Sequence, residues 1–587
     1  MSQFGKAILF ATALSACTQT AAAPPEKLHM LVRAPSDADN PFLASANGAF
    51  VAVTAEAPDI PPDKYQVVQP YKSGMSVALP DLPFGRRQVR VEVWSRDPAT
   101  GNPAPPILGR GRTVPVNVTR DGAASTVHPY ITKINQFAPV VDDTGIAAKL
   151  DGRVGAASVT LPSGQVLIVG GGALSGTAKN PYDPTSFLKF SDTILAYDPD
   201  SRQLVSPSKL ADSVTLKFGR ALHAMAVGRS VVAVVGGLSQ ADGTTKPTNS
   251  VEYFDINTGK MLTSAAASPD LVYARVQPTV IQMFDNEDYF LILGGKGNTP
   301  CTDSGNDIEC AANTWEIWSP VDGAILKGRM NEARWNQAAV RLPAPDGGYV
   351  MLIGGENDGG VLGTFEVIQF NNGGSVAQKG FACSDPPPSD GRCSPGQLDP
   401  HWQPMTGYLR DGAGRTMLGA VFLSTAKYNF VYMIGGFSDK AHKVPSNRVD
   451  IFDIASGVYV DAGADFALAT ARGAPIVAAA VTPTHPGQVL VAGGSTSETT
   501  HLDSSEFLWI NPDEFKLTLN KDGSGAVTGE SIAGARVVGV ENGLLGGNRA
   551  QGTAAALWTG HVLVVGGATG DSGSVSAQPA LTLWNPF

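Results

Sequence analysis

Seven glycine pairs, each closing an apolar run, constrain the fold of this chain more than any other feature of its sequence. The runs are QVLIVGG, VVAVVGG, YFLILGG, YVMLIGG, FVYMIGG, QVLVAGG and HVLVVGG, with first glycines at Gly170, Gly236, Gly294, Gly354, Gly435, Gly493 and Gly566. Successive pairs lie 58 to 81 residues apart, so one module recurs with loops of different length. Apolar runs without alternation predict strands covered on both faces, and glycine permits a positive φ where each strand ends.

Two further features recur in every module. A second strand-like segment follows each glycine pair and ends in turn residues, as in VEYFDINTG from Val251 and VDIFDIASG from Val449. An arginine stands 16 to 21 residues before each pair, and the seven are Arg153, Arg220, Arg275, Arg334, Arg415, Arg472 and Arg549.

The arginine, the Gly-Gly strand and the following strand together resemble the repeat of kelch β-propellers and the wider galactose-oxidase-like propeller superfamily. The resemblance covers residues 137–587 and implies seven four-stranded blades around a central axis. The chain ends at Trp584-Asn585-Pro586-Phe587, just after the third strand of the last blade. We therefore expect the segment near Phe137 to Leu150 to supply the missing outer strand and close the ring.

A second domain is predicted ahead of the propeller. Residues 28–132 contain strand-like stretches such as GAFVAVTAE and QVRVEVWS, with turn residues between them. An immunoglobulin-like or fibronectin-like β-sandwich without a cysteine pair fits this pattern. The expected fold class is all-β, with this sandwich followed by a seven-bladed kelch-type propeller.

Composition agrees with many short strands and excludes one class of function. Glycine and proline number 66 and 42 among 587 residues, whereas charged residues are only 16%. The net charge of -10 lacks the basic excess that neutralising phosphates requires, which disfavours a nucleic-acid partner.

The N-terminus predicts export. Residues 1–17 form a signal peptide with one lysine, Lys6, and an apolar run, and they end in Leu14-Ser15-Ala16-Cys17. This ending resembles the lipobox of bacterial lipoproteins, which implies acylation of Cys17 and, with Thr18 next, sorting to the outer membrane. Residues 18–27 read as a tether, and the lipid is the sole membrane contact we expect.

Four other cysteines form two local pairs in polar, turn-rich loops. An oxidising compartment favours disulfides between Cys301 and Cys310 and between Cys383 and Cys393. A metal site is the rival interpretation, but neither pair has C-x-x-C spacing or a histidine beside it.

The seven arginines are the candidate binding residues. Propeller topology places them around the axis at one mouth. In one interpretation they bond backbone carbonyls or the third-strand carboxylates Glu252, Glu316, Glu366 and Asp450. In the other they form an electropositive funnel for a carboxylate-bearing peptide or sugar.

No cofactor and no metal are predicted. His442 and His501 are expected to be solvated loop residues, whereas His223 and His561 are expected to be packed. Kelch-type copper radical chemistry is disfavoured because every cysteine is already assigned. The calcium-loop match around Asp522 is better explained as a hairpin turn, since Glu530 falls at position eleven instead of twelve.

These observations favour a non-catalytic envelope lipoprotein that binds a protein or glycan, acidic ones included, through the propeller mouth. A sugar-modifying enzyme similar to kelch sialic-acid epimerases is the first alternative, and a purely structural envelope component is the second. The sequence specifies neither the ligand nor the number of subunits.

Overall fold

The computed structural model describes most of residues 29–371 and 405–586, apart from several short loops. The described chain is all-β, with helical structure limited to short 3-10 turns such as η2 (Pro41–Leu43) and η5 (Arg410–Gly412). No described helix is long and apolar enough to cross a membrane.

Seven antiparallel sheets in the described chain share one strand order, and each sheet corresponds to one sequence repeat. The first strand of each repeat contacts the first strand of the next repeat, and the seventh contacts the first, so these strands form a closed inner ring. This arrangement is of the β-propeller class. The first strands are β11 (Ala157–Thr160), β18 (Ala224–Val227), β24 (Thr279–Gln282), β30 (Ala338–Ala344), β36 (Gly419–Ser424), β40 (Ile476–Ala479) and β48 (Thr553–Ala556).

The second strands are the apolar Gly-Gly runs, and they are buried on both faces, as predicted. In the first repeat, Leu167 and Val169 pack against the second repeat, while Val166 and Ile168 pack against the seventh. The hydrophobic core is therefore divided into layers between neighbouring sheets. The second strands are β12 (Val166–Val169), β19 (Val231–Val235), β25 (Phe290–Leu293), β31 (Gly347–Ile353), β37 (Asn429–Ile434), β41 (Val489–Ala492) and β49 (Val562–Val565).

The third and fourth strands complete each sheet. The third strands are β15 (Ile194–Asp198), β22 (Val251–Asp255), β28 (Thr314–Ser319), β34 (Thr364–Asn371), β38 (Val449–Asp453), β44 (Ser505–Ile510) and β52 (Leu581–Trp584). The outer strands of the first six repeats are β16 (Gln203–Val205), β23 (Lys260–Met261), β29 (Gly323–Arg329), β35 (Met405–Tyr408), β39 (Val458–Asp461) and β47 (Ala535–Gly539).

The seventh sheet takes its outer strand from the segment that precedes the first repeat. Strand β10 (Phe137–Pro139) pairs antiparallel with β52, with Phe137 opposite Trp584. The prediction that a segment near Phe137 closes the ring is confirmed.

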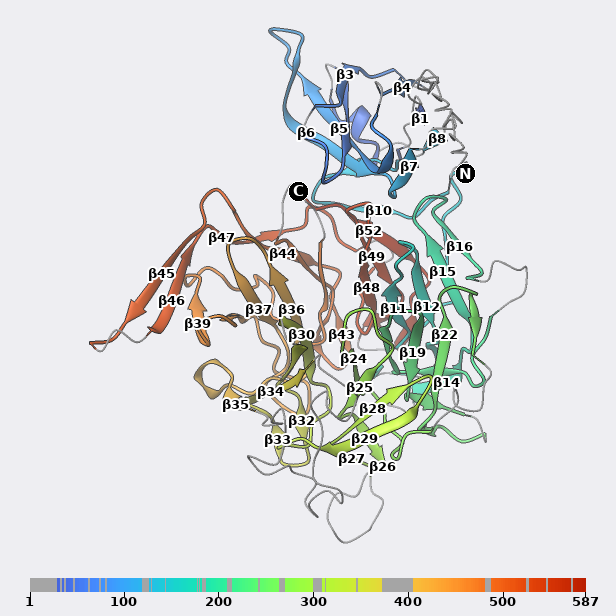
Figure 1. Ribbon diagram of the computed structural model, residues 1–587, viewed down its shortest axis with the longest axis vertical. Helices are drawn as coiled ribbons and strands as arrows, with labels where there is room; N and C mark the ends of the chain where they lie inside the picture. Colours follow the sequence, from blue (N-terminus) through green and yellow to red (C-terminus); the bar gives the residue numbers. More distant parts are fainter. Residues whose placement is uncertain are drawn as a thin grey trace, which may run out of the picture.

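Short hairpins join second to third strands on one face, which we call the mouth. Those of the third and fourth repeats, β26 with β27 and β32 with β33, are labelled at the lower end of Figure 1. The mouth hairpins are β13 (Gly172–Leu174) with β14 (Phe187–Phe190), β20 (Leu238–Ser239) with β21 (Lys246–Pro247), β26 (Lys296–Asn298) with β27 (Glu309–Ala311), β32 (Glu356–Asn357) with β33 (Gly360–Val361), β42 (Ser495–Ser497) with β43 (Thr500–His501), and β50 (Ala568–Asp571) with β51 (Ser574–Ala577). A further short strand, β17 (Arg220–Ala221), pairs with β20.

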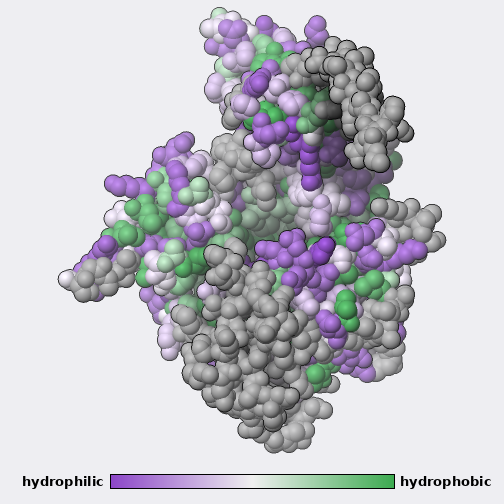
Figure 2. Space-filling model, in the orientation of Figure 1, coloured by the Kyte–Doolittle hydropathy of each residue, from purple (hydrophilic) through white to green (hydrophobic). Residues whose placement is uncertain are grey.

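One connection departs from this plan. Between the third and fourth strands of the sixth repeat, a long hairpin of β45 (Lys516–Lys521) and β46 (Val527–Ala533) extends sideways, at the left of Figures 1 and 2. Strand β46 pairs in parallel with β39 of the fifth repeat, which makes a six-stranded sheet. Asp522 follows β45 in the connection to β46, in agreement with the hairpin interpretation of this segment. The described surface in Figure 2 mixes hydrophilic and hydrophobic residues.

The N-terminal region consists of two sheets that share one hydrophobic core. One sheet contains β1 (His29–Leu31), β4 (Ser76–Ala78) and β8 (Thr126–Val127). The other contains β2 (Ala49–Glu56), β3 (Gln66–Pro70), β5 (Gly85–Arg96), β6 (Pro103–Arg112), β7 (Val116–Val118) and β9 (Thr132–Lys133). Val51 and Val91 of the larger sheet share their core with Val77 and Val127 of the smaller one. The immunoglobulin-like or fibronectin-like assignment stays a prediction.

This N-terminal region is seated on the face opposite the mouth, at the top of Figure 1. Thr132 Oγ1 lies 3.0 Å from His561 Nε2, and the Asn585 side-chain amide donates to the carbonyl oxygens of Arg110 and Thr132 at 2.8 and 2.9 Å. Arg86 lies over the Trp558 ring, 4.6 Å from its centroid. The mouth is therefore left clear of this domain.

Several predictions lie outside the described residues. These are the signal peptide, the lipobox with Cys17, the tether, and the disulfides, since Cys301, Cys383 and Cys393 are not described and only the backbone of Cys310 is.

Candidate functional site

The glycine pairs link each repeat to the next. The N–H of the second glycine donates to the carbonyl oxygen of the following repeat's arginine at all seven junctions, over 2.8 to 3.1 Å, and Gly567 closes the circle onto Arg153. Both glycines of every pair have positive φ. A Cβ on any first glycine would lie closer than 3.0 Å to that same arginine carbonyl. The pairs are thus required by both backbone conformation and close approach.

The arginine side chains are buried within their own repeats. In the first six repeats, Nη1 of the arginine donates to the carbonyl of the first glycine over 2.7 to 3.2 Å. In the second to sixth repeats, Nη2 also binds a buried third-strand carboxylate. The pairs are Arg220–Glu252, Arg275–Glu316, Arg334–Glu366, Arg415–Asp450 and Arg472–Glu506.

Two repeats lack a carboxylate at that third-strand position, which Leu195 and Thr582 occupy. Arg153 pairs instead with Asp151, whose Oδ1 is 2.5 Å from Nη2. Arg549 donates to the carbonyl of Ala580 at 3.3 Å, and burial lowers its pKa to about 10.

The interpretation of the seven arginines as an electropositive funnel is therefore wrong. Arg153, Arg220, Arg275, Arg334, Arg415, Arg472 and Arg549 are each at most 3% exposed. Their guanidinium groups point into the sheets, toward carbonyls and carboxylates, so the internal-partner interpretation describes them. The arginines hold the strands that surround the mouth, but their charged groups are not exposed at its surface.

A cavity of about 320 Å³ lies on the ring axis at the mouth, where the first strands begin. Each repeat contributes the residues two and three positions after its arginine. The lining consists of Gly155, Ala156, Leu222, His223, Gln277, Pro278, Thr279, Asn336, Gln337, Met417, Leu418, Ala474, Pro475, Gln551 and Gly552. We call this space the axial cavity.

The backbone around the axial cavity is strained. The residue two positions after each arginine has a left-handed φ, between 46° and 65° in all seven repeats. Six of these residues are not glycine, and two are the bulky Leu222 and Met417. Left-handed backbone costs such residues about 1–2 kcal/mol each. Hydrogen bonds between neighbouring repeats help to hold it, as from Leu222 N to Gly155 O at 2.8 Å and from Gln277 N to Leu222 O at 2.8 Å. Strain of this kind tends to collect at functional sites.

Four lining side chains carry buried polar atoms without a hydrogen-bond partner among the described residues. These atoms are both ring nitrogens of His223, both amide atoms of Gln551, Asn336 Oδ1 and Gln337 Oε1. His223 is 7% exposed, and burial together with the charge of Arg220 lowers its pKa to about 3, so its ring is neutral. The axial cavity therefore offers several uncharged donors and acceptors.

One side of the mouth carries a polar chain that starts at the axial cavity and is buried as far as His442. Asn336 donates through its amide to Glu356 Oε1 at 3.0 Å, and Glu356 Oε2 lies 3.4 Å from His442 Nε2. His442 Nδ1 lies 3.6 Å from Glu498 Oε1. The chain crosses three repeats, which is an arrangement suited to proton transfer.

A buried apolar cluster lies beneath the mouth hairpins of the seventh, first and second repeats and extends to Val276 of the third repeat. Its members include Val154, Phe187, Phe190, Leu238, Ala568 and Val575.

The histidine predictions have mixed outcomes. His223 and His561 are packed, as expected, and burial lowers the pKa of His561 to about 4. The expectation for His442 and His501 is wrong, because both are buried. His501 Nδ1 lies 2.9 Å from Ser495 Oγ inside the β42–β43 hairpin. The His442 ring packs against Phe437, with ring centroids 5.4 Å apart, and contacts Glu356 of the fourth repeat.

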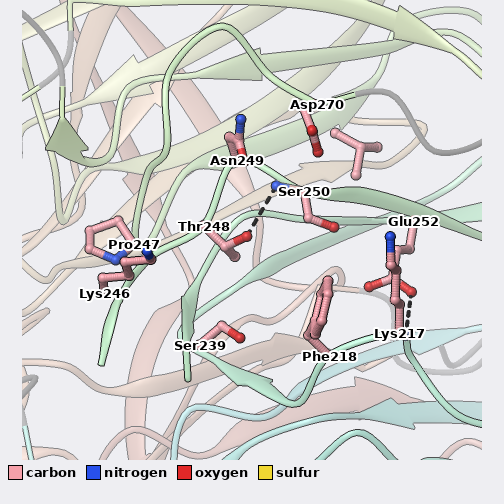
Figure 3. A pocket seen from close by; sticks show the side chains of 11 residues that line it. Lys217, Phe218, Ser239, Lys246, Pro247, Thr248, Asn249, Ser250, Glu252 and Asp270 are labelled. Atoms are coloured by element: carbon pink, nitrogen blue, oxygen red, sulfur yellow. Dashed lines mark hydrogen bonds between the residues drawn. The ribbon is translucent and has the colours of Figure 1, made fainter. Parts of the chain in front are cut away.

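A second hollow, of about 280 Å³, lies outside the axis beside the second repeat (Figure 3). Its polar groups are largely engaged. Glu252 binds Arg220 and accepts from the Lys217 N–H at 2.7 Å, and Thr248 Oγ1 accepts from the Ser250 N–H at 3.2 Å. This makes it a weaker candidate than the axial cavity.

Metal binding finds no support in the described part of the chain, where no group of three or more histidine, cysteine or carboxylate side chains could hold an ion.

Comparisons with known proteins add no function. No protein-family model matches the chain, and neither does any curated protein. A solved structure described as that of YjhT is similar to 62% of this chain and 96% of its own, with a TM-score of 0.38 and 12% sequence identity.

Sequence reasoning missed the axial cavity, although a signal for it is present. The residues two and three positions after each recurring arginine form a register of their own. Read across the seven repeats, that register is rich in amides. Nothing local in the sequence marks these positions as left-handed, because that conformation is imposed by the neighbouring repeat.

Proposed function

We propose that this protein is an envelope lipoprotein whose seven-bladed kelch-type propeller binds a protein or glycan at its mouth, without catalysis. The axial cavity is the observation that carries the proposal. It gathers lining from all seven repeats and presents buried polar atoms that have no described partner. A bound ligand would supply hydrogen bonds to these atoms.

The position of the N-terminal domain, on the face opposite the mouth, supports binding at the mouth. This domain packs on that face through Thr132, His561 and Asn585, so a chain anchored through Cys17 would present the mouth away from this contact. The sandwich would then act as a spacer between the lipid and the propeller.

Binding is tested with the full chain in a detergent free of sugar groups, applied to glycan arrays and to envelope extracts. We expect retention of a discrete glycan or protein, and loss of retention when Gln551→Leu alters the axial cavity. Retention that is unchanged in this variant would place the ligand elsewhere, and no retention at all would contradict a binding role.

Anchoring is tested independently. We expect Cys17→Ser to release the protein from the membrane fraction. Unchanged membrane retention of this variant would contradict lipidation without bearing on the mouth.

An enzyme is the second candidate, and one observation favours it. The chain from Asn336 through Glu356 to His442 joins the cavity to a carboxylate–histidine pair that could move a proton. The seven arginines are already engaged, so they would not take part. Anomer interconversion or epimerisation of sugars by the full chain, lost in Glu356→Gln, would establish this alternative.

A further inference from the structure

We propose that the axial cavity takes an uncharged polyol of about the size of a monosaccharide, and that it discriminates against the carboxylate form of the same sugar. The inference rests on the proposed function, because it names the group that the mouth would receive from a glycan.

The first argument is charge. The lining contains no lysine, arginine, aspartate or glutamate. His223, the one lining residue with a titratable side chain near neutrality, stays uncharged because it is buried beside Arg220. The arginines around the axis are neutralised in five repeats by carboxylates of their own sheets. A carboxylate entering the cavity would lose water without gaining an opposite charge, which is unfavourable.

The second argument is hydrogen bonding. The buried atoms without described partners are of mixed kind: amide and imidazole nitrogens, and amide oxygens of Asn336, Gln337 and Gln551. A hydroxyl group both donates and accepts, so it can satisfy either kind of atom. His223 and Gln551 each offer a donor and an acceptor, and several hydroxyls on one molecule match this spread of sites.

The third argument is shape and surface. A volume of about 320 Å³ falls at the small end of the range of small-molecule pockets, which is about 300–1,000 Å³. Between its polar atoms the lining presents apolar side chains, including Leu222, Met417, Leu418 and Ala474. A sugar ring has the same mixture, with C–H faces and hydroxyl edges. The cavity is thus matched to a small amphipathic ring and not to an ion.

The test is isothermal titration calorimetry on the full chain in a zwitterionic detergent. The probes are matched pairs of a neutral sugar and its uronic acid: glucose with glucuronate, galactose with galacturonate, and mannose with mannuronate. We expect at least one neutral sugar to bind about tenfold more tightly than its acid. Gln551→Leu and His223→Phe should each weaken that binding by about threefold to tenfold, because each removes hydrogen-bonding atoms.

Gln165→Leu is the matched control. Gln165 is a half-buried glutamine in the turn between β11 and β12, on the face away from the mouth, so its loss should leave sugar affinity unchanged. Thermal unfolding confirms that each variant is folded, and Gln551→Leu carries the test if His223→Phe does not fold.

Three results would overturn the inference: acids that bind as tightly as neutral sugars, no binding by any neutral sugar, or parental affinity in Gln551→Leu. If macromolecular glycans are still retained at the mouth in any of these cases, the proposed function stands and the cavity inference alone fails.

Discussion

One arginine in each of the second to sixth repeats joins the first, second and third strands of its sheet. Arg334, for example, binds the carbonyl of Gly354 and the carboxylate of Glu366, while its own carbonyl accepts from the N–H of Gly295 in the preceding repeat. Removing one partner of a buried ion pair leaves the other charge buried and uncompensated, which is strongly destabilising. These arginines therefore stabilise the folded protein.

We expect Arg334→Met to lower the free energy of unfolding by about 3–5 kcal/mol, because it leaves Glu366 buried without its partner. The double variant Arg334→Met with Glu366→Gln should recover part of the loss, since it removes the unpaired charge but keeps an acceptor for the backbone N–H groups of Asn331 and Glu332. Urea unfolding of the full chain measures both. If Arg334→Met is folded but binds ligand more weakly, this result would contradict a purely structural role for Arg334.

The glycine pairs make an equally specific prediction. Gly435 has a φ of 59°, and a Cβ there would lie 2.5 Å from the Arg472 carbonyl oxygen. Gly457 has a φ of 74° but open space around it. Gly435→Ala should therefore cost at least about 2 kcal/mol, and Gly457→Ala only about 1 kcal/mol. Equal losses of unfolding free energy in the two variants, measured by urea unfolding, would contradict this account. They would show that the positive φ alone, and not the close approach to the Arg472 carbonyl, requires glycine at position 435.

At the scale of elements, the β45–β46 hairpin joins the sixth repeat to the fifth by the pairing of β46 with β39, and this contact brings two buried acids together. Glu530 of β46 faces Asp453 of β38, and both are buried. Burial and the nearby Asp453 carboxylate raise the pKa of Glu530. The carboxyl group of Glu530 therefore binds its proton more tightly in the folded protein than in the unfolded chain. Stability then falls as the pH rises from about 4.5 through the raised pKa.

Glu530→Gln imitates the protonated side chain, so we expect it to raise the midpoint of urea unfolding at pH 7.5 and to have little effect at pH 4.5. Glu514→Gln is the control, because Arg536 lowers the pKa of Glu514 and its replacement should not stabilise the protein at pH 7.5. A stabilisation by Glu530→Gln that is the same at both pH values would contradict the carboxyl pair.

At the scale of the whole molecule, the ring depends on residues from both ends of the propeller, which are far apart in the sequence. Phe137 of β10 is buried with Trp584 and Val562 in the core between the sixth and seventh repeats. We expect Phe137→Ala to cost about 3–5 kcal/mol, whereas Phe84→Ala, at a side chain 40% exposed, should cost far less. Urea unfolding of the two variants checks this, and similar losses would argue against closure through β10.

The sequence predicted the ring more fully than the site. The Gly-Gly runs and their spacing indicated buried second strands, because an apolar run that ends in glycines is a property of one repeat. The pairing of β10 with β52 agrees with the closure expected near Phe137. The burial of His442 and the left-handed backbone at Met417 depend on contacts with neighbouring repeats. A local sequence pattern carries no information about such contacts. The arginines were recognised correctly as recurrent, but their partners Glu506 and Asp151 were found only in the structure.

Hydrogen–deuterium exchange tests the central claim most directly, which is that ligand binds in the axial cavity. The full chain is compared with and without the neutral sugar that binds most tightly in calorimetry. We predict protection in the peptides that carry the lining residues, around Leu222, Asn336, Met417 and Gln551, with the far-face turn around Trp558 unchanged. Protection confined to the far face or to the N-terminal domain, or no protection at saturation, would contradict the claim.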